Sequence, residues 1–119
     1  LKAGAICISA LYDLRPLLHV PSVMGATRFT QGSARALSPA WMTPPTPAPL
    51  LTALGSAENP GFHAQARTIQ DQWHAVHAGH ITCIGHDHFS ILDELTHRDG
   101  AIAVAAVRLM QTFDAPTSP

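Results

Sequence analysis

Three short apolar runs, each followed by a helix-like pattern, limit most strongly what this chain can fold into. The runs cover residues 3–9, 50–54 and 80–85. Continuous apolar runs of this length are typical of strands that are buried on both faces of a parallel sheet. Because strand and helix patterns alternate along the chain, the strands must be joined by crossover connections. We therefore predict an α/β fold with three parallel strands and flanking helices.

Capping residues and turn residues predict where the helices begin and end. Thr30 can cap a short helix over residues 31–37. Asn59 is a fair cap for a longer helix over residues 60–78, with Pro60 in its first turn, and Gly79 is a plausible terminator. The remaining predicted segments are a rigid proline-rich connection, a short helix and a final amphipathic helix, at residues 39–49, 90–96 and 101–113.

Composition excludes several classes of protein. Of the 119 residues, 46% are hydrophobic and 13% are charged, which is typical of a globular domain. The net charge is -1 and Lys2 is the only lysine, so nothing indicates binding to nucleic acid or to an anionic membrane. No apolar run approaches the ~18 residues of a membrane span. Cys7 and Cys83 both lie in predicted strands and are interpreted as core thiols, which favours a cytoplasmic location.

Candidate catalytic residues follow the three predicted strands. Asp13 comes after the first, Glu58 after the second, and His86 and His88 after the third. Ligands of open parallel sheets gather at the carboxyl ends of the strands. A carboxylate beside a histidine at this edge can fix the histidine tautomer, so that the other ring nitrogen accepts a proton from a nucleophile. Glu58 can alternatively be a helix N-terminal acid, and Asp13 a turn residue.

The chain lacks the nucleophile that such a pair would serve. In α/β-hydrolases the nucleophile precedes the acid, and the acid precedes the histidine. None of the serines stands in a G-x-S-x-G elbow, and no HGG-type segment is present. The chain also opens almost directly into a strand pattern at Leu1. We therefore expect a fragment whose upstream sequence would carry the nucleophile.

Four segments in order resemble the C-terminal part of kynurenine formamidase-like (arylformamidase) α/β-hydrolases. They are AICISALYDLRPLL, ARALSPAW, LGSAENPGFHAQARTIQDQW and HDHFSILDEL, at residues 5–18, 34–41, 54–73 and 86–95. The resemblance covers nearly the whole chain. It implies that residues 1–119 form the C-terminal portion of one α/β-hydrolase domain, without the half that carries the nucleophile elbow.

The resemblance also implies the site and the activity. His88, which precedes Phe89, matches the family's catalytic histidine, and Glu58 matches its catalytic acid, a position where members commonly have aspartate. The implied activity is a serine hydrolase for a small N-formyl amide, such as N-formylkynurenine of tryptophan degradation, or for a small ester. We expect no cofactor, a small-molecule substrate as the partner, and a homo-oligomer as one assembly state. The chain alone is expected to be inactive.

Two other interpretations compete with this one. The chain can be a non-catalytic fragment or a degenerate paralogue. It can also be a histidine-rich metal-binding domain, since His74 and His77 would share a helix face and His80 follows closely. No H-E-x-x-H arrangement supports a metal, so we expect none. Trp41 is interpreted as a packing residue, with a substrate-pocket wall as the alternative.

Overall fold

The core of the fold is a parallel sheet of three strands in sequential order. The computed structural model describes residues 4–21, 25, 28 and 30–114. The strands are β1 (Ala5–Ile8), β2 (Leu50–Gly55) and β3 (His77–Cys83), and β2 lies between the other two. Both pairings are parallel. The predicted α/β class, with three parallel strands and flanking helices, is confirmed.

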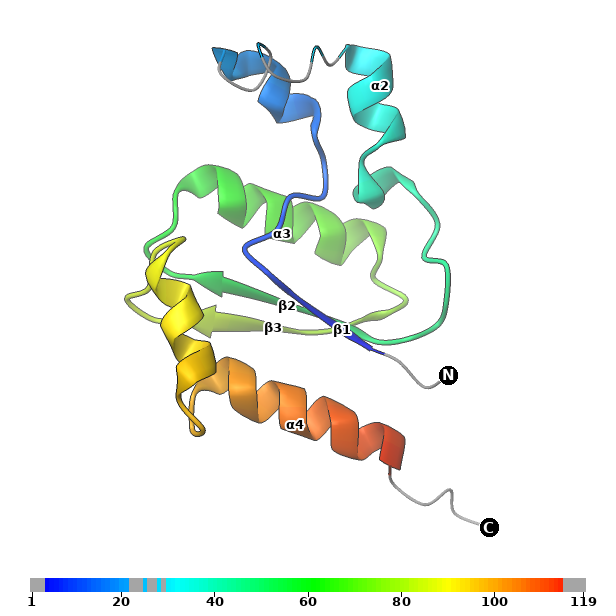
Figure 1. Ribbon diagram of the computed structural model, residues 1–119. Helices are drawn as coiled ribbons and strands as arrows, with labels where there is room; N and C mark the ends of the chain where they lie inside the picture. The colour runs from blue at the N-terminus through cyan, green and yellow to red at the C-terminus, as the bar shows by residue number, and fades with distance from the viewer. Residues whose placement is uncertain (1–3, 22–24, 26–27, 29, 115–119) are drawn as a thin grey trace.

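Helices lie on both sides of this sheet (Figure 1). The β1–β2 connection and the long helix α3 (Pro60–Gln72) lie on one side, and α4 (Ala101–Asp114) lies on the other. Both predicted caps are present, because the Thr30 side chain accepts from the Ser33 N–H and the Asn59 side chain accepts from the Gly61 N–H. The other helical segments are α2, η1, η2 and η3, at Gln31–Ala36, Arg15–His19, Pro39–Trp41 and Ser90–Thr96.

The sheet buries apolar side chains on each of its two faces. One cluster packs Leu50 of β2 and Ile69 of α3 with Tyr12. The other packs Ala53 and Cys83 of the sheet against residues from η3 and α4. Residues of the central strand contribute to both clusters, as expected for a strand that is covered on both faces.

The boundary between α3 and β3 differs from the prediction. We predicted a helix to position 78 and a strand from position 80, but α3 ends at Gln72 and β3 begins at His77. Gly79 is therefore a strand residue and not a helix terminator. Its neighbours in β3 alternate between exposed and half-buried positions, because successive side chains of a strand point to opposite faces of the sheet.

None of the helices in the described part of the chain is long and apolar enough to cross a lipid bilayer.

Candidate active site

The carboxylate of Glu58 lies in a buried pocket of hydrogen-bond donors at the end of β2. Its side chain is completely shielded from solvent. Glu58 Oε2 accepts hydrogen bonds from Ser9 Oγ at 2.6 Å and from the Gly55 N–H at 2.7 Å. These donors come from the ends of β1 and β2, so this oxygen ties the two strands together.

The second oxygen of Glu58 faces a histidine from the loop after β3. His88 Nδ1 lies 2.9 Å from Glu58 Oε1, and the His88 side chain is 44% exposed. An ionised carboxylate only accepts, so Nδ1 carries the proton and donates. In the neutral ring Nε2 is then a proton acceptor. Among the residues that the structure describes, none hydrogen-bonds to Nε2 of His88.

The environment of Glu58 favours the ionised carboxylate. Burial by itself raises the pKa of Glu58, but the hydrogen bonds from Ser9, from the Gly55 N–H and from His88 together outweigh it. The pKa of Glu58 therefore lies below its ordinary value. A carboxylate that stays ionised can hold the Nδ1–H tautomer and stabilise an imidazolium ring.

Backbone contacts hold the loops after β2 and β3 against each other. Gly55 lies so close to the His86 carbonyl that a Cβ at position 55 would overlap it. Ala57 N–H donates to the same carbonyl at 3.0 Å, and the Gly85 N–H donates to Ser56 Oγ at 2.8 Å. This close approach places Glu58 within hydrogen-bond distance of His88.

The other candidate residues from the sequence form hydrogen bonds with partners outside the Glu58–His88 pair. Both carboxylate oxygens of Asp13 accept from the Arg15 guanidinium, whose hydrogen bond lowers the pKa of Asp13. Asp13 Oδ1 also accepts from the Arg15 N–H, so Asp13 occupies the turn that was its alternative interpretation. His86, the rival of His88, contacts Ser90 Oγ and Glu94 Oε1 at 3.1 and 3.0 Å.

A buried glutamine of α3 fixes the segment that follows β1. Gln65 Oε1 accepts from the N–H groups of Tyr12 and Asp13, at 2.9 and 2.8 Å, and Gln65 Nε2 donates to the Asp13 carbonyl at 2.7 Å. A single side chain therefore satisfies three backbone groups of an irregular segment that would otherwise be buried without partners.

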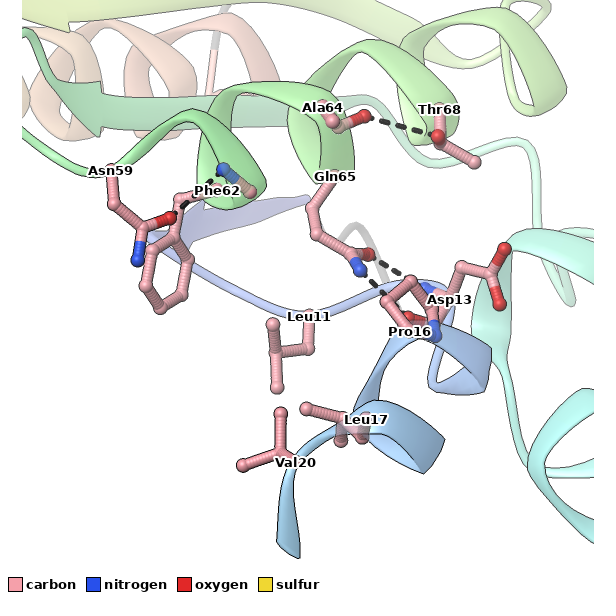
Figure 2. Close-up of a pocket in the computed structure, with 11 residues that line it drawn as sticks. Leu11, Asp13, Pro16, Leu17, Val20, Asn59, Phe62, Ala64, Gln65 and Thr68 are labelled. Carbon is pink, nitrogen blue, oxygen red and sulfur yellow. Dashed lines mark hydrogen bonds between the residues drawn. The ribbon is translucent and has the colours of Figure 1, made fainter. Parts of the chain in front are cut away.

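An apolar cavity lies beside this glutamine (Figure 2). Its volume is about 370 Å³. Its wall includes Leu11, Leu17, Val20 and Phe62. The Phe62 ring also stacks on the His88 ring, with centroids 4.5 Å apart and planes 21° apart. The cavity and the Glu58–His88 pair thus share one aromatic side chain.

The structure does not bring the proposed metal-binding histidines together as expected. His77 lies in β3 and not on a helix face with His74. His77 Nε2 and His80 Nδ1 both contact Thr52 Oγ1, at 3.0 and 2.7 Å. Burial lowers the pKa of both histidines. Within the described ranges, no group of three or more His, Cys, Asp or Glu side chains could hold a metal ion.

Trp41 does not line the cavity. Two guanidinium groups lie over its ring, with Arg15 4.8 Å and Arg35 5.1 Å from the ring centroid. These cation–π contacts indicate a packing role for Trp41 in the β1–β2 connection.

Ser9 is the site residue that sequence reasoning missed. It follows β1 with a positive φ of 51°, a conformation that non-glycine residues seldom adopt. This backbone turn directs Oγ at Glu58. The only signal in the sequence is a hydroxyl residue at the end of the first apolar run.

Comparisons with known proteins give one informative match. No protein-family model and no curated protein matches the chain. A crystal structure from Silicibacter sp. TM1040, described as that of a proposed thioesterase, is similar over 85% of this chain, with 28% sequence identity and a TM-score of 0.76. The chain spans only 37% of the length of that protein.

This comparison corrects the resemblance stated above. The matching structure is described as a proposed thioesterase, and no formamidase is among the matches. The assignment to kynurenine formamidases is therefore wrong, and nothing supports the N-formylkynurenine substrate or the place in tryptophan degradation that it implied.

Proposed function

We propose that this chain supplies the acid–histidine pair of a hydrolase that cleaves acyl thioesters and related small esters. The observation that carries the proposal is the bond of 2.9 Å between His88 Nδ1 and the solvent-shielded carboxylate of Glu58. It leaves Nε2 on an accessible ring, in the state that a general base requires. The likeness to a protein described as a proposed thioesterase supports the choice of substrate.

The proposed chemistry is acyl transfer to a hydroxyl nucleophile and then to water. His88 Nε2 takes the proton of the nucleophile as its oxygen attacks the carbonyl carbon, and Glu58 stabilises the imidazolium. When the tetrahedral intermediate collapses, the carbon–sulfur bond breaks and His88 returns the proton to the departing thiolate. In the second half, His88 activates water in the same way, which releases the acid and regenerates the hydroxyl.

The nucleophile is proposed to be a serine outside these 119 residues. Residues 1–119 would then form the C-terminal portion of an α/β-hydrolase domain. The support is that the chain matches only 37% of the longer similar protein, and that its sequence contains no G-x-S-x-G elbow. Among the described residues, the serine hydroxyl nearest the acid, Ser9 Oγ, donates to Glu58 and not to His88.

Hydrolysis of acyl thioesters by the protein that contains this chain tests the proposal. We expect His88→Ala to lower kcat by roughly 10³-fold or more, because the general base is lost. His97→Ala is the matched control, since His97 is exposed and has no part in the site. Equal activity in the two variants, or no hydrolysis of thioesters and esters by the unchanged protein, would refute the proposed function.

Labelling with an alkyl fluorophosphonate tests the nucleophile separately. The reagent reacts with serines that are activated by an adjacent base. We expect one labelled serine outside residues 1–119, and loss of the label in His88→Ala. Turnover without any labelled serine would instead mean that His88 activates water directly.

A further inference from the structure

We propose that the cavity beside Phe62 binds the acyl group of the substrate, and that this group is an uncharged apolar chain of several carbons. This inference rests on the proposed function, because it takes the substrate to be an acyl thioester or a small ester. The binding itself depends only on the cavity, so it can be tested without turnover.

The walls of the cavity are contributed by two segments that pack across from each other (Figure 2). Leu11, Leu17 and Val20 come from the segment after β1, and Phe62 and Gln65 come from the first turns of α3. The three aliphatic side chains and the Phe62 ring present carbon to the cavity. A volume of about 370 Å³ lies within the usual range of small-molecule sites.

The polar side chains of the wall offer little to a polar ligand. Both ends of Gln65 are occupied by backbone groups of Tyr12 and Asp13. The Thr68 hydroxyl donates to the Ala64 carbonyl, and Asn59 Oδ1 accepts from the Gly61 N–H, which leaves the Asn59 amide NH₂ group as a donor at the rim of the wall. A ligand that needed the bonded atoms would have to break existing bonds, so most of the cavity favours apolar surface.

The charges of the wall argue against a ligand with a carboxylate inside the cavity. The Asp13 carboxylate points away from the Leu11 and Phe62 side chains (Figure 2) and is paired with Arg15. Among the described residues that line the cavity there is no lysine, arginine or histidine, so a ligand carboxylate there would lack a counter-charge. An acyl chain that ends in a methyl group or a ring avoids this cost.

Phe62 connects the cavity to the Glu58–His88 pair. Its ring lines the cavity and stacks on His88 at 4.5 Å between centroids. The cavity therefore begins beside the ring that stacks on His88, and the proposal places the reacting carbonyl carbon next to this ring, near His88 Nε2. The chain on the acyl side of that carbonyl can extend past Phe62 toward Leu11.

Binding of primary amides of increasing length tests the inference without hydrolysis. Acetamide, butanamide, hexanamide and octanamide carry the same carbonyl and no charge, and their affinities can be measured by NMR titration. We expect the dissociation constant to fall about threefold to fourfold for each added methylene until the cavity is full, because each buried CH₂ contributes roughly 0.8 kcal/mol. A dissociation constant that does not depend on length would overturn the inference.

Leu11→Trp identifies the cavity as the place of binding. Leu11 is 38% exposed, so a larger side chain can be accommodated at the rim while it fills the cavity. We expect it to weaken octanamide binding at least tenfold and to leave acetamide binding unchanged. Leu37→Trp is the control, because Leu37 is 56% exposed and lies outside the cavity. Equal effects of the two substitutions would place the amide elsewhere and overturn the inference.

The two proposals fail in different ways. If octanamide binds and Leu11→Trp blocks it, while no thioester is hydrolysed, the cavity inference holds and the proposed function falls. If thioesters are hydrolysed at rates that are independent of acyl length, the proposed function holds and the cavity inference falls.

Discussion

At the scale of single residues, the two oxygens of Glu58 have different partners. Oε2 accepts from Ser9 and from the Gly55 N–H, and Oε1 faces His88. One oxygen therefore joins the strand ends, while the other orients the histidine. A substitution that changes only one of these functions can separate structure from catalysis.

Glu58→Gln is that substitution. The amide oxygen of the introduced glutamine can keep the bonds from Ser9 and Gly55, which turns the amide NH₂ group toward His88. Nδ1 must then accept, and the proton moves to Nε2, the wrong tautomer for a base. We expect kcat for thioester hydrolysis to fall about 10³- to 10⁴-fold with the urea midpoint nearly unchanged. A midpoint that falls as steeply as the activity would mean that the role of Glu58 is structural.

Ser9→Ala tests the hydrogen bond to Oε2 through pH. The lowered pKa of Glu58 means that this group stabilises the fold above its unfolded pKa of about 4.3, and that the contribution is lost as the pH falls below this value. Without Ser9 Oγ the folded pKa rises toward its ordinary value. We expect the free energy of unfolding, measured in urea at about pH 6 and about pH 3.5, to change less in Ser9→Ala than in the unchanged protein. Asp13 and Asp87 titrate in both proteins, so they cancel in the difference.

The sequence alone predicted the carboxylate–histidine pair but not the residues whose hydrogen bonds hold Glu58 in place. Glu58 and His88 follow adjacent apolar runs, and the general rule that ligands gather at the carboxyl ends of parallel strands was enough to place them near each other. The role of Ser9 depends on a positive φ that no residue pattern reveals. His88 was preferred over His86 only through its place before Phe89 in the family resemblance, whereas the structure shows directly that the His88 ring faces Glu58.

At the scale of elements, the contact between the ends of β2 and β3 depends on the absence of a side chain at position 55. Gly55→Ala would place a methyl group against the His86 carbonyl, which belongs to the backbone and cannot turn away. We expect a loss of about 1–3 kcal/mol in the free energy of unfolding, as for other overpacked sites, and a parallel loss of activity as Glu58 and His88 separate.

Gly32→Ala is the control for this change. Gly32 lies in α2, where an added Cβ meets only Thr30 Oγ1 at 3.9 Å. Alanine favours a helix over glycine by about 1 kcal/mol, so we expect unchanged or slightly higher stability. If both substitutions have the same effect in urea titrations, the contact at Gly55 is not what holds the two loops.

The elements themselves were predictable to different degrees. The caps at Thr30 and Asn59 are local signals, and both helices begin where these residues predict. The end of α3 was not found, because the apolar and histidine residues from Ala75 to His80 fit a helix about as well as a strand. The alternation of exposed and half-buried residues in β3 appears only in the folded structure, because the residue types of HAGHITC do not alternate between polar and apolar in the same way.

At the scale of the whole molecule, the domain is more extended than its length predicts. Its radius of gyration is 16.0 Å. A compact domain of this size would have about 13.5 Å. Within the described residues, β1 and β3 each pair on one side only, with β2. The large side chains of Ile84 and Phe89 are each 81% exposed. These surfaces favour association with other chain segments.

We therefore expect concentration-dependent oligomers when residues 1–119 are studied alone. Ala5→Lys should reduce them, because Ala5 is exposed on β1 and a lysine on an edge strand opposes strand pairing. Ala36→Lys adds the same charge at an exposed position of α2, which belongs to neither edge strand. Sedimentation velocity would show a larger shift toward monomer for Ala5→Lys. A monomer at all concentrations in the unchanged chain would contradict the expectation.

Because the three strands run in the same direction, the start of β1 and the last turns of α4 lie at the opposite end of the sheet from the candidate site. β1 begins, and α4 returns, at the amino end of the sheet, where Leu109 approaches Gly4 (Figure 1). Glu58 and His88 lie at the opposite end. A neighbouring segment joined ahead of β1 must run the length of a strand, about 20 Å for six residues, before it can reach His88. A fluorophore attached near Leu109 of α4 would therefore lie on the far side from Glu58 and His88 and leave the approach of a substrate open.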